Sequence, residues 1–197
     1  MFPVIPFMLF AASQVGTPGP ANMALLATSA RFGVRRILPF MLGVILGKQF
    51  IIWPLGFGLM EVATSAPAVY TAMTYAAATY ICYLAWRVAG MSLNTDQTVA
   101  TAPGFAAGLI VHPLNPKAWA MITTGFAFVP AGTSTLVATA WIAGLLLLCQ
   151  TILQPLWAIA GEIIAKTIQG TRYERVLFIT LAILTVVSVF YALFLGA

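Results

Sequence analysis

The sequence predicts an all-α integral membrane protein with six transmembrane helices. Of its 197 residues 61% are hydrophobic and only 7% are Asp, Glu, Lys or Arg, and the mean hydropathy is +1.00. A soluble domain carries about 25% charged residues, whereas about 20 consecutive apolar residues make one membrane span. Since only short connectors remain between the spans, residues 1–197 are expected to form a single transmembrane domain.

Turn residues and charges divide the apolar sequence into six runs. The predicted spans are residues 3–30, 37–60, 67–90, 104–129, 135–161 and 176–195. A polar linker, residues 91–103, separates the first three spans from the last three. An odd number of spans in each half gives the halves opposite orientations, which is the inverted-repeat plan of many secondary transporters. We therefore expect repeat 1 over about residues 1–90 and repeat 2 over about residues 104–197.

The first span is expected to be broken in the stretch TPGP, residues 17–20. Its beginning, MFPVIPFMLF, has no basic residue, and the apolar pattern continues past any plausible cleavage site, so it is interpreted as part of the span rather than a secretory signal. Pro18 and Pro20 remove backbone donors and clash with the preceding turn. Gly19 followed by Pro20 is a favoured way to begin a helix. A new helix is therefore predicted to start within the first span.

The fourth span has a matching break in the stretch HPLNPKAWAM, residues 112–121. Pro113 and Pro116 interrupt the helix, and Asn115 followed by Pro116 is the second predicted helix start. At 1.5 Å per helical residue, Asn115 lies about 16 Å into a hydrocarbon core about 30 Å thick. Helices 1 and 4 are therefore both predicted to be broken near mid-membrane. One such proline is usually a packing kink, but two paired breaks at matching positions favour a functional role.

Irregular backbone at that depth is tolerated only where it is buried in protein or lines a wet cavity. Two helix N-termini, each with unpaired N–H groups and a positive dipole end, would face the midplane from opposite sides. Such termini bind anions. The breaks therefore predict a site suited to a carboxylate.

The positions of the basic residues predict the orientation in the membrane. Seven lie between spans or at a span end: Arg31, Arg35, Arg36, Arg87, Lys166, Arg172 and Arg175. The connectors after spans 2 and 4 and both termini contain no Lys or Arg, which is a strong positive-inside signal. The connectors after spans 1, 3 and 5 are therefore expected in the cytoplasm and both termini on the outer, periplasmic or extracellular side. The net charge of +5 then reflects topology and contact with the lipid bilayer, and no nucleic-acid partner is expected.

The other two basic residues, Lys48 and Lys117, fall at mid-depth in spans 2 and 4. A charged lysine there costs about 2.5–3.5 kcal/mol unless it is paired or hydrated. The acidic residues lie in connectors or at span ends: Glu61, Asp96, Glu162 and Glu174. The predicted centre is therefore positive. Three roles are open to the lysines: they bind a substrate carboxylate, they donate to unwound carbonyls, or they exchange protons. The third role is physically sensible because burial disfavours the charged form of lysine. His112 is a third proton-coupling candidate, although a lone histidine is more often a local hydrogen-bonding residue.

Three motifs give the chain a resemblance to a known family. TPGP near the N-terminus, a GxxxG in span 2 and LNPKAW in span 4 resemble the LysE/RhtB superfamily of bacterial amino-acid exporters. The resemblance extends over the whole chain. It implies export of amino acids or related small metabolites across the bacterial inner membrane, driven by a proton or ion gradient. The residues it places at the site are Thr17, Pro18, Gly19, Pro20, Gly43, Gly47, Asn115, Pro116 and Lys117.

Two further substrate-binding candidates mark departures from the family pattern. A polar residue usually follows TPGP directly, but here Ala21 intervenes and the polar residue is Asn22. The residue after the second glycine of the span-2 motif is often Asp, but here it is Lys48. With Lys48 in place of Asp, a cation-handling or carboxylate-based coupling role does not carry over from the family to that position.

Several smaller expectations concern packing and partners. The pairs Gly43–Gly47 and Gly104–Gly108 fit close helix approach, and for them packing is favoured over ligand contact. Cys82 and Cys149 are expected to be small buried hydrophobes. For the substrate α-amino group, the candidates besides carbonyls freed by the breaks are Asn22, Gln49, Thr123, Gln150 and Gln154.

Together these features predict a proton-coupled secondary exporter of small, neutral amino acids or derivatives. A positive centre without carboxylates suits a neutral or an anionic substrate better than lysine or arginine. A passive channel for small metabolites and a non-transporting accessory subunit remain alternatives. No Ser–His arrangement, paired carboxylates or metal-ligand cluster appears in the sequence, so neither an enzyme nor a cofactor or metal is expected. A homodimer is left open.

Overall fold

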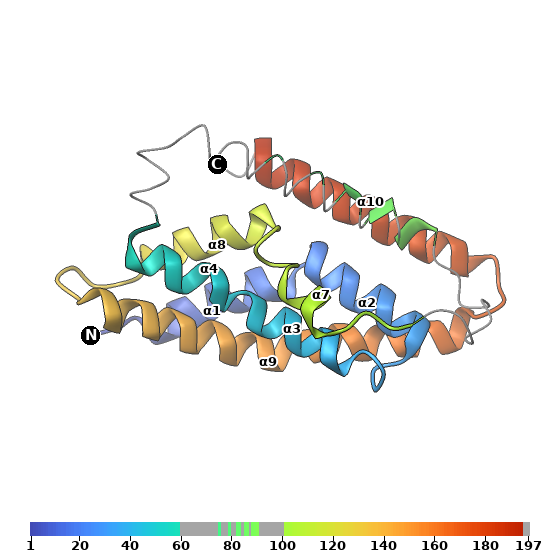
Figure 1. The fold of residues 1–197 in the computed structure, drawn as a ribbon, viewed down its shortest axis with the longest axis horizontal. Coiled ribbons are helices and arrows are strands. Elements are labelled where there is room, and N and C mark those ends of the chain that lie inside the picture. The colour runs from blue at the N-terminus through green and yellow to red at the C-terminus, as the bar shows by residue number, and fades with distance from the viewer. Residues whose placement is uncertain are drawn as a thin grey trace.

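The computed structural model describes residues 1–59, 75, 79, 82–83, 85–86, 88–90 and 101–194. Every regular element within these residues is helical: α1 (Val4–Gly16), α2 (Pro20–Phe32), α3 (Leu38–Gly47), α4 (Gln49–Pro54), η1 (Leu55–Leu59), α7 (Phe105–Leu109), α8 (Pro116–Phe126), α9 (Thr135–Ile168) and α10 (Tyr173–Phe194). Figure 1 shows α9, in orange, running along the length of the bundle. It packs against α1, α2, α3, α4 and α8.

Several predictions fall outside the described residues. They are most of the third span (67–90), the connector after span 2, most of the linker 91–103, and the residues Glu61, Arg87 and Asp96. The arrangement of six helices as an inverted repeat therefore stays a prediction.

Two stretches of the described chain are long and apolar enough to cross a membrane, Leu38–Gly58 and Thr135–Ile168. Helix α1 is apolar but shorter. The outward face of α9 carries a stripe of exposed apolar side chains at helical spacing: Leu148, Ile152, Leu156, Ile159 and Ile163. Because a soluble protein rarely exposes so continuous an apolar face, this stripe is suited to contact with lipid.

Both predicted helix breaks are present. Helix α1 ends at Gly16, and α2 begins at Pro20 after Gly19, whose backbone is extended with φ −179°. In the fourth predicted span, the short helix α7 gives way to turns, and α8 begins at Pro116 after the N-cap Asn115. In each case proline occupies the first helical position, where its missing N–H costs nothing and its fixed φ favours the helix.

The end of the fifth predicted span needs correction. Helix α9 does not end at residue 161 but continues to Ile168, with Pro155 inside it. Lys166 therefore lies in its last turn rather than in a connector. Span 2 corresponds to the apolar helical stretch Leu38–Gly58, in which Lys48, with αR backbone, stands between α3 and α4. Beyond Lys48, Pro54 supplies no backbone donor, and the π-helical turn η1 follows.

Glycines permit direct backbone contact between α3 and α7. A Cβ on Gly43 or Gly47 would overlap a carbonyl oxygen of α7, and a Cβ on Gly108 would overlap the carbonyl oxygen of Phe40 in α3. No described atom lies within 4 Å of where a Cβ on Gly104 would be. The expected packing role is therefore confirmed for Gly43, Gly47 and Gly108, whereas no described residue packs against Gly104.

Candidate substrate site between the helix breaks

A cavity of about 30 Å³ lies where the two breaks meet. Seven of the predicted site residues line it: Thr17, Gly19, Asn22, Lys48, His112, Asn115 and Lys117. The prolines Pro18, Pro20 and Pro116 shape the adjoining backbone, whereas Gly43 and Gly47 pack against α7 instead. The structure thus brings together residues from opposite halves of the sequence.

Lys117 joins the two breaks directly. Its Nζ donates to Thr17 Oγ1 at 2.8 Å and to the Pro18 carbonyl oxygen at 3.2 Å. A Cβ on Gly19 would lie 3.4 Å from the same Nζ, so the small residue leaves room for the lysine. Of the three roles expected for the lysines, Lys117 adopts donation to an unwound carbonyl in this structure. Thr17 and Pro18 are exposed, so this side of the site is open to the surroundings.

Asn22 holds the first break together. Its Nδ2 donates to the carbonyl oxygens of Val15 at 2.7 Å and Thr17 at 2.8 Å. These two carbonyls, released where α1 ends, are therefore already paired. Since both amide hydrogens of Asn22 are engaged, the side chain stabilises the unwound backbone in the state described here.

The N-termini of α2 and α8 differ in their capping. At α8, Asn115 Oδ1 accepts from the Lys117 N–H at 3.1 Å, and the Asn115 carbonyl accepts from the Ala118 N–H at 2.9 Å. The expectation of unpaired N–H groups is therefore wrong at α8, because its own N-cap satisfies them. Helix α2 begins with Gly19 and receives no side-chain cap from the described residues. Of the two, α2 has the N-terminus that can receive an anion.

Lys48 is buried, with 3% of its surface exposed, so its side chain does not reach either end of the bundle. Within the described residues its Nζ contacts Met121 Sδ at 3.9 Å, and a thioether sulfur is a weak acceptor. No carboxylate among the described residues lines the cavity. Met121 was not identified from the sequence, although its spacing of four residues from Lys117 places both on one face of α8.

His112 lies in a local hydrogen-bonded cluster, as its lone-histidine interpretation predicted. Its Nε2 is 3.3 Å from Gln150 Nε2 and 3.2 Å from Gln154 Nε2. All three side chains are buried, and Gln154 also lines the cavity.

The other residues considered for the α-amino group lie away from the cavity. Gln49 donates to the Ala143 carbonyl at 3.2 Å and accepts from Trp53 Nε1 at 3.1 Å, and Thr123 is exposed. Of the two cysteines, Cys149 is buried as expected. Cys82 is half-exposed, which corrects the expectation for that residue.

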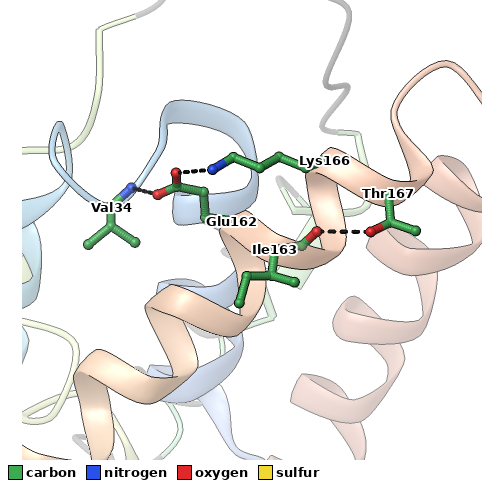
Figure 2. A network of polar contacts seen from close by, with 5 residues as sticks. All are labelled: Val34, Glu162, Ile163, Lys166 and Thr167. Atoms are coloured by element: carbon green, nitrogen blue, oxygen red, sulfur yellow. Dashed lines mark hydrogen bonds and ion pairs between the residues drawn. The ribbon is translucent and has the colours of Figure 1, made fainter.

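The end of α9 remote from the cavity is joined to the connection between α2 and α3. Figure 2 shows Glu162 accepting from the Val34 backbone N–H at 2.8 Å and pairing with Lys166 at 2.9 Å. Thr167 Oγ1 donates to the Ile163 carbonyl in the same turn, at 3.2 Å. Glu162 is therefore engaged at this end of the bundle, and it does not neutralise the lysines of the cavity.

Two broken helices that meet at a cavity lined by polar side chains are an arrangement typical of secondary transporters. The sequence profile of the family described as LysE type translocator matches residues 12–196. The chain belongs to this family, which confirms the resemblance carried by TPGP and LNPKAW.

Curated relatives match along most of their length. The cysteine/O-acetylserine efflux proteins of Escherichia coli (strain K12), Escherichia coli O9:H4 (strain HS) and Shigella sonnei (strain Ss046) are each 29% identical to this chain over 182 residues. The matched segment covers 89% of this chain and 91% of each relative. No solved structure matches the chain.

Proposed function

We propose that this protein exports small, neutral amino acids or their derivatives across the bacterial inner membrane, in exchange for protons. Membership of the translocator family and the names of the curated relatives support an amino-acid substrate of the cysteine or O-acetylserine kind. The observation that carries the proposal is the positive cavity at the paired breaks, where Lys48 and Lys117 lie without a carboxylate among the described lining residues.

The carboxylate of the substrate is proposed to bind at the start of α2. The backbone N–H groups of Ala21 and Asn22 lie in its first turn, at the positive end of the helix dipole. Lys117 reaches the same break and has three donor hydrogens, of which Thr17 and Pro18 occupy two in this structure. An anion at this position would receive backbone and side-chain donors together.

The charge of the site also limits the substrate. A lysine or arginine side chain would enter a cavity that already holds two lysines and, among the described residues, offers no carboxylate. Since an unpaired buried cation is costly, basic amino acids should be transported poorly.

For proton coupling we propose Lys48 and Lys117, with His112 as the third candidate. Lys48 is the strongest of these, because its Nζ is buried beside a weak acceptor and can be neutralised at lower cost than an ion-paired lysine. Replacing both lysines with alanine should abolish the stimulation of transport by a pH gradient. Unchanged gradient-driven transport in the double variant would contradict this role.

The proposal is tested by uptake into proteoliposomes of labelled cysteine, O-acetylserine, serine, threonine, homoserine, leucine, lysine and glutamate. Each is measured with and without an imposed pH gradient. Gradient-dependent accumulation of a neutral member, with lysine excluded, is expected. Accumulation of lysine would contradict the charge argument. Movement that only ever follows the concentration gradient would contradict active export and support the channel alternative.

A further inference from the structure

Two glutamines of α9 and one histidine form a buried polar cluster beside the cavity. Gln150 and Gln154 are one helical turn apart, so both point from the same face of α9, and both amide nitrogens approach the same ring nitrogen of His112. The exposed fractions are 0% for Gln150, 1% for Gln154 and 4% for His112. Such a cluster is costly to bury unless its polar atoms are paired.

The pairing is incomplete in a specific way. Among the described residues, the buried side-chain nitrogen and oxygen atoms without a hydrogen-bond partner are Gln150 Oε1, Gln154 Oε1 and His112 Nδ1. All of them belong to this cluster. Both amide nitrogens lie within hydrogen-bond distance of His112 Nε2, and with the ring proton on Nδ1 the single lone pair of Nε2 accepts from one amide N–H at a time. In that tautomer the amide nitrogens of both glutamines face the histidine, and their oxygens have no partner among the described residues.

We propose that Gln150 and Gln154, positioned by His112, bind the α-ammonium group of the transported amino acid through their amide oxygens. The inference rests on the proposed function and deepens it, since it restricts the substrates to compounds with a free amino group. An ammonium has three donors and no acceptor, so it matches a pair of unpartnered oxygens.

Several backbone carbonyls freed near the breaks are already engaged. The carbonyls of Val15 and Thr17 accept from Asn22, and that of Pro18 accepts from Lys117. The amide nitrogen and the amide oxygen of Gln49 both form hydrogen bonds with residues outside the cavity. The oxygens of Gln150 and Gln154 are the fully buried side-chain acceptors that the described residues leave without a partner.

The amide oxygens of Gln150 and Gln154 carry no net charge, so the proposed site has a positive end and a neutral end. This polarity suits a zwitterionic amino acid. An amino acid would place its carboxylate toward Lys117 and the start of α2, and its ammonium toward the glutamines, so that each charge is solvated by groups of matching polarity. A compound with a hydroxyl in place of the ammonium can still bind through its carboxylate at Lys117 and the start of α2. Its hydroxyl forms weaker hydrogen bonds with the glutamines than an ammonium does. The two ends of the site can therefore be tested separately.

The experiment measures uptake of labelled L-cysteine into proteoliposomes, competed by unlabelled L-serine or by D-glycerate, which carries a hydroxyl in place of the amino group. In the wild type, serine should compete about tenfold better than glycerate. Gln154→Leu should bring the two competitors within about twofold of one another, and Gln150→Leu should shift the ratio in the same direction. Gln154→Glu, which keeps the acceptor oxygens, should retain the preference for serine.

Gln169→Leu, the same exchange at the exposed end of α9, is the control and should leave the ratio unchanged. If Gln154→Leu weakens serine and glycerate equally, the glutamine has a structural role and the inference is overturned. Equal competition by serine and glycerate in the wild type would also overturn it while leaving the exporter intact. Failure of the wild type to take up any amino acid of the panel would instead overturn the proposed function. If Gln154→Leu does not fold, Gln150→Leu and Gln154→Glu decide the matter.

Discussion

At the scale of single residues, Lys117 has an unusual position because it belongs to one break and bonds to the other. Its two hydrogen bonds to Thr17 and Pro18 link segments about 100 residues apart in the sequence. The lysine is half-buried, so its charge is partly hydrated, and it can exchange a protein acceptor for a substrate carboxylate at small cost. This makes it both a structural link and a binding group.

Lys117→Met should lower the transport rate by about 10- to 100-fold. The change removes the ammonium, and hydrogen bonds to charged groups contribute about 1.5–3 kcal/mol each. The measurement is initial uptake of labelled cysteine per reconstituted protein. Lys166→Met is the matched control, because Lys166 makes an exposed ion pair with Glu162, and such pairs contribute little. Equal rates in Lys117→Met and the wild type would contradict a binding role.

At the scale of elements, the contact between α3 and α7 positions the second break. Gly43, Gly47 and Gly108 let the two backbones touch, and the turns between α7 and α8 follow directly. A side chain at this contact would push α7 away and with it the segment that holds His112 and Asn115. Packing at the glycines thus affects the geometry of the cavity, although the glycines do not line it.

Gly108→Ala should destabilise the protein by about 1–3 kcal/mol, because the added Cβ overlaps the backbone of α3. Gly144→Ala is the control for this exchange. No described atom lies within 4 Å of a Cβ built at Gly144, which is inside α9, so alanine there should leave stability unchanged or raise it by about 0.5–1 kcal/mol. Thermal unfolding in detergent measures both. A Gly108→Ala variant as stable as the wild type would contradict the close contact.

At the scale of the whole molecule, the structure places the basic segments near one another. The hydrogen bond from Val34 to Glu162 brings the connection after α2, with Arg35 and Arg36, to the end of α9 that carries Lys166 (Figure 2). This arrangement supports the proposal that both segments face the cytoplasm. The homodimer left open by the sequence stays a prediction.

The orientation can be tested with single cysteines introduced after Cys82→Ala and Cys149→Ala. A cysteine at Ser134, between α8 and α9, should react with a membrane-impermeant maleimide in intact cells. A cysteine at Arg35 should react only after permeabilisation. Both positions are exposed, so the maleimide can reach either one. The reverse pattern would show that the basic connections lie outside and would contradict the predicted topology.

The sequence by itself determined where the helices break. Proline and glycine act on the backbone of their immediate neighbours, so Gly19–Pro20 and Asn115–Pro116 specify helix starts without help from distant residues. Composition likewise determined that the protein is a membrane protein and that Lys48 and Lys117 would find few acids nearby. The correct family followed from the same local motifs.

Only the tertiary structure decided which groups at those breaks are already paired. The bonds of Asn22 to Val15 and Thr17, the capping of α8 by its own asparagine, and the approach of Lys117 to Thr17 depend on how distant segments pack. The same holds for the unpartnered oxygens of Gln150 and Gln154. Residue type states what a side chain can bond to, but the choice among possible partners depends on distance and burial, which the folded bundle sets.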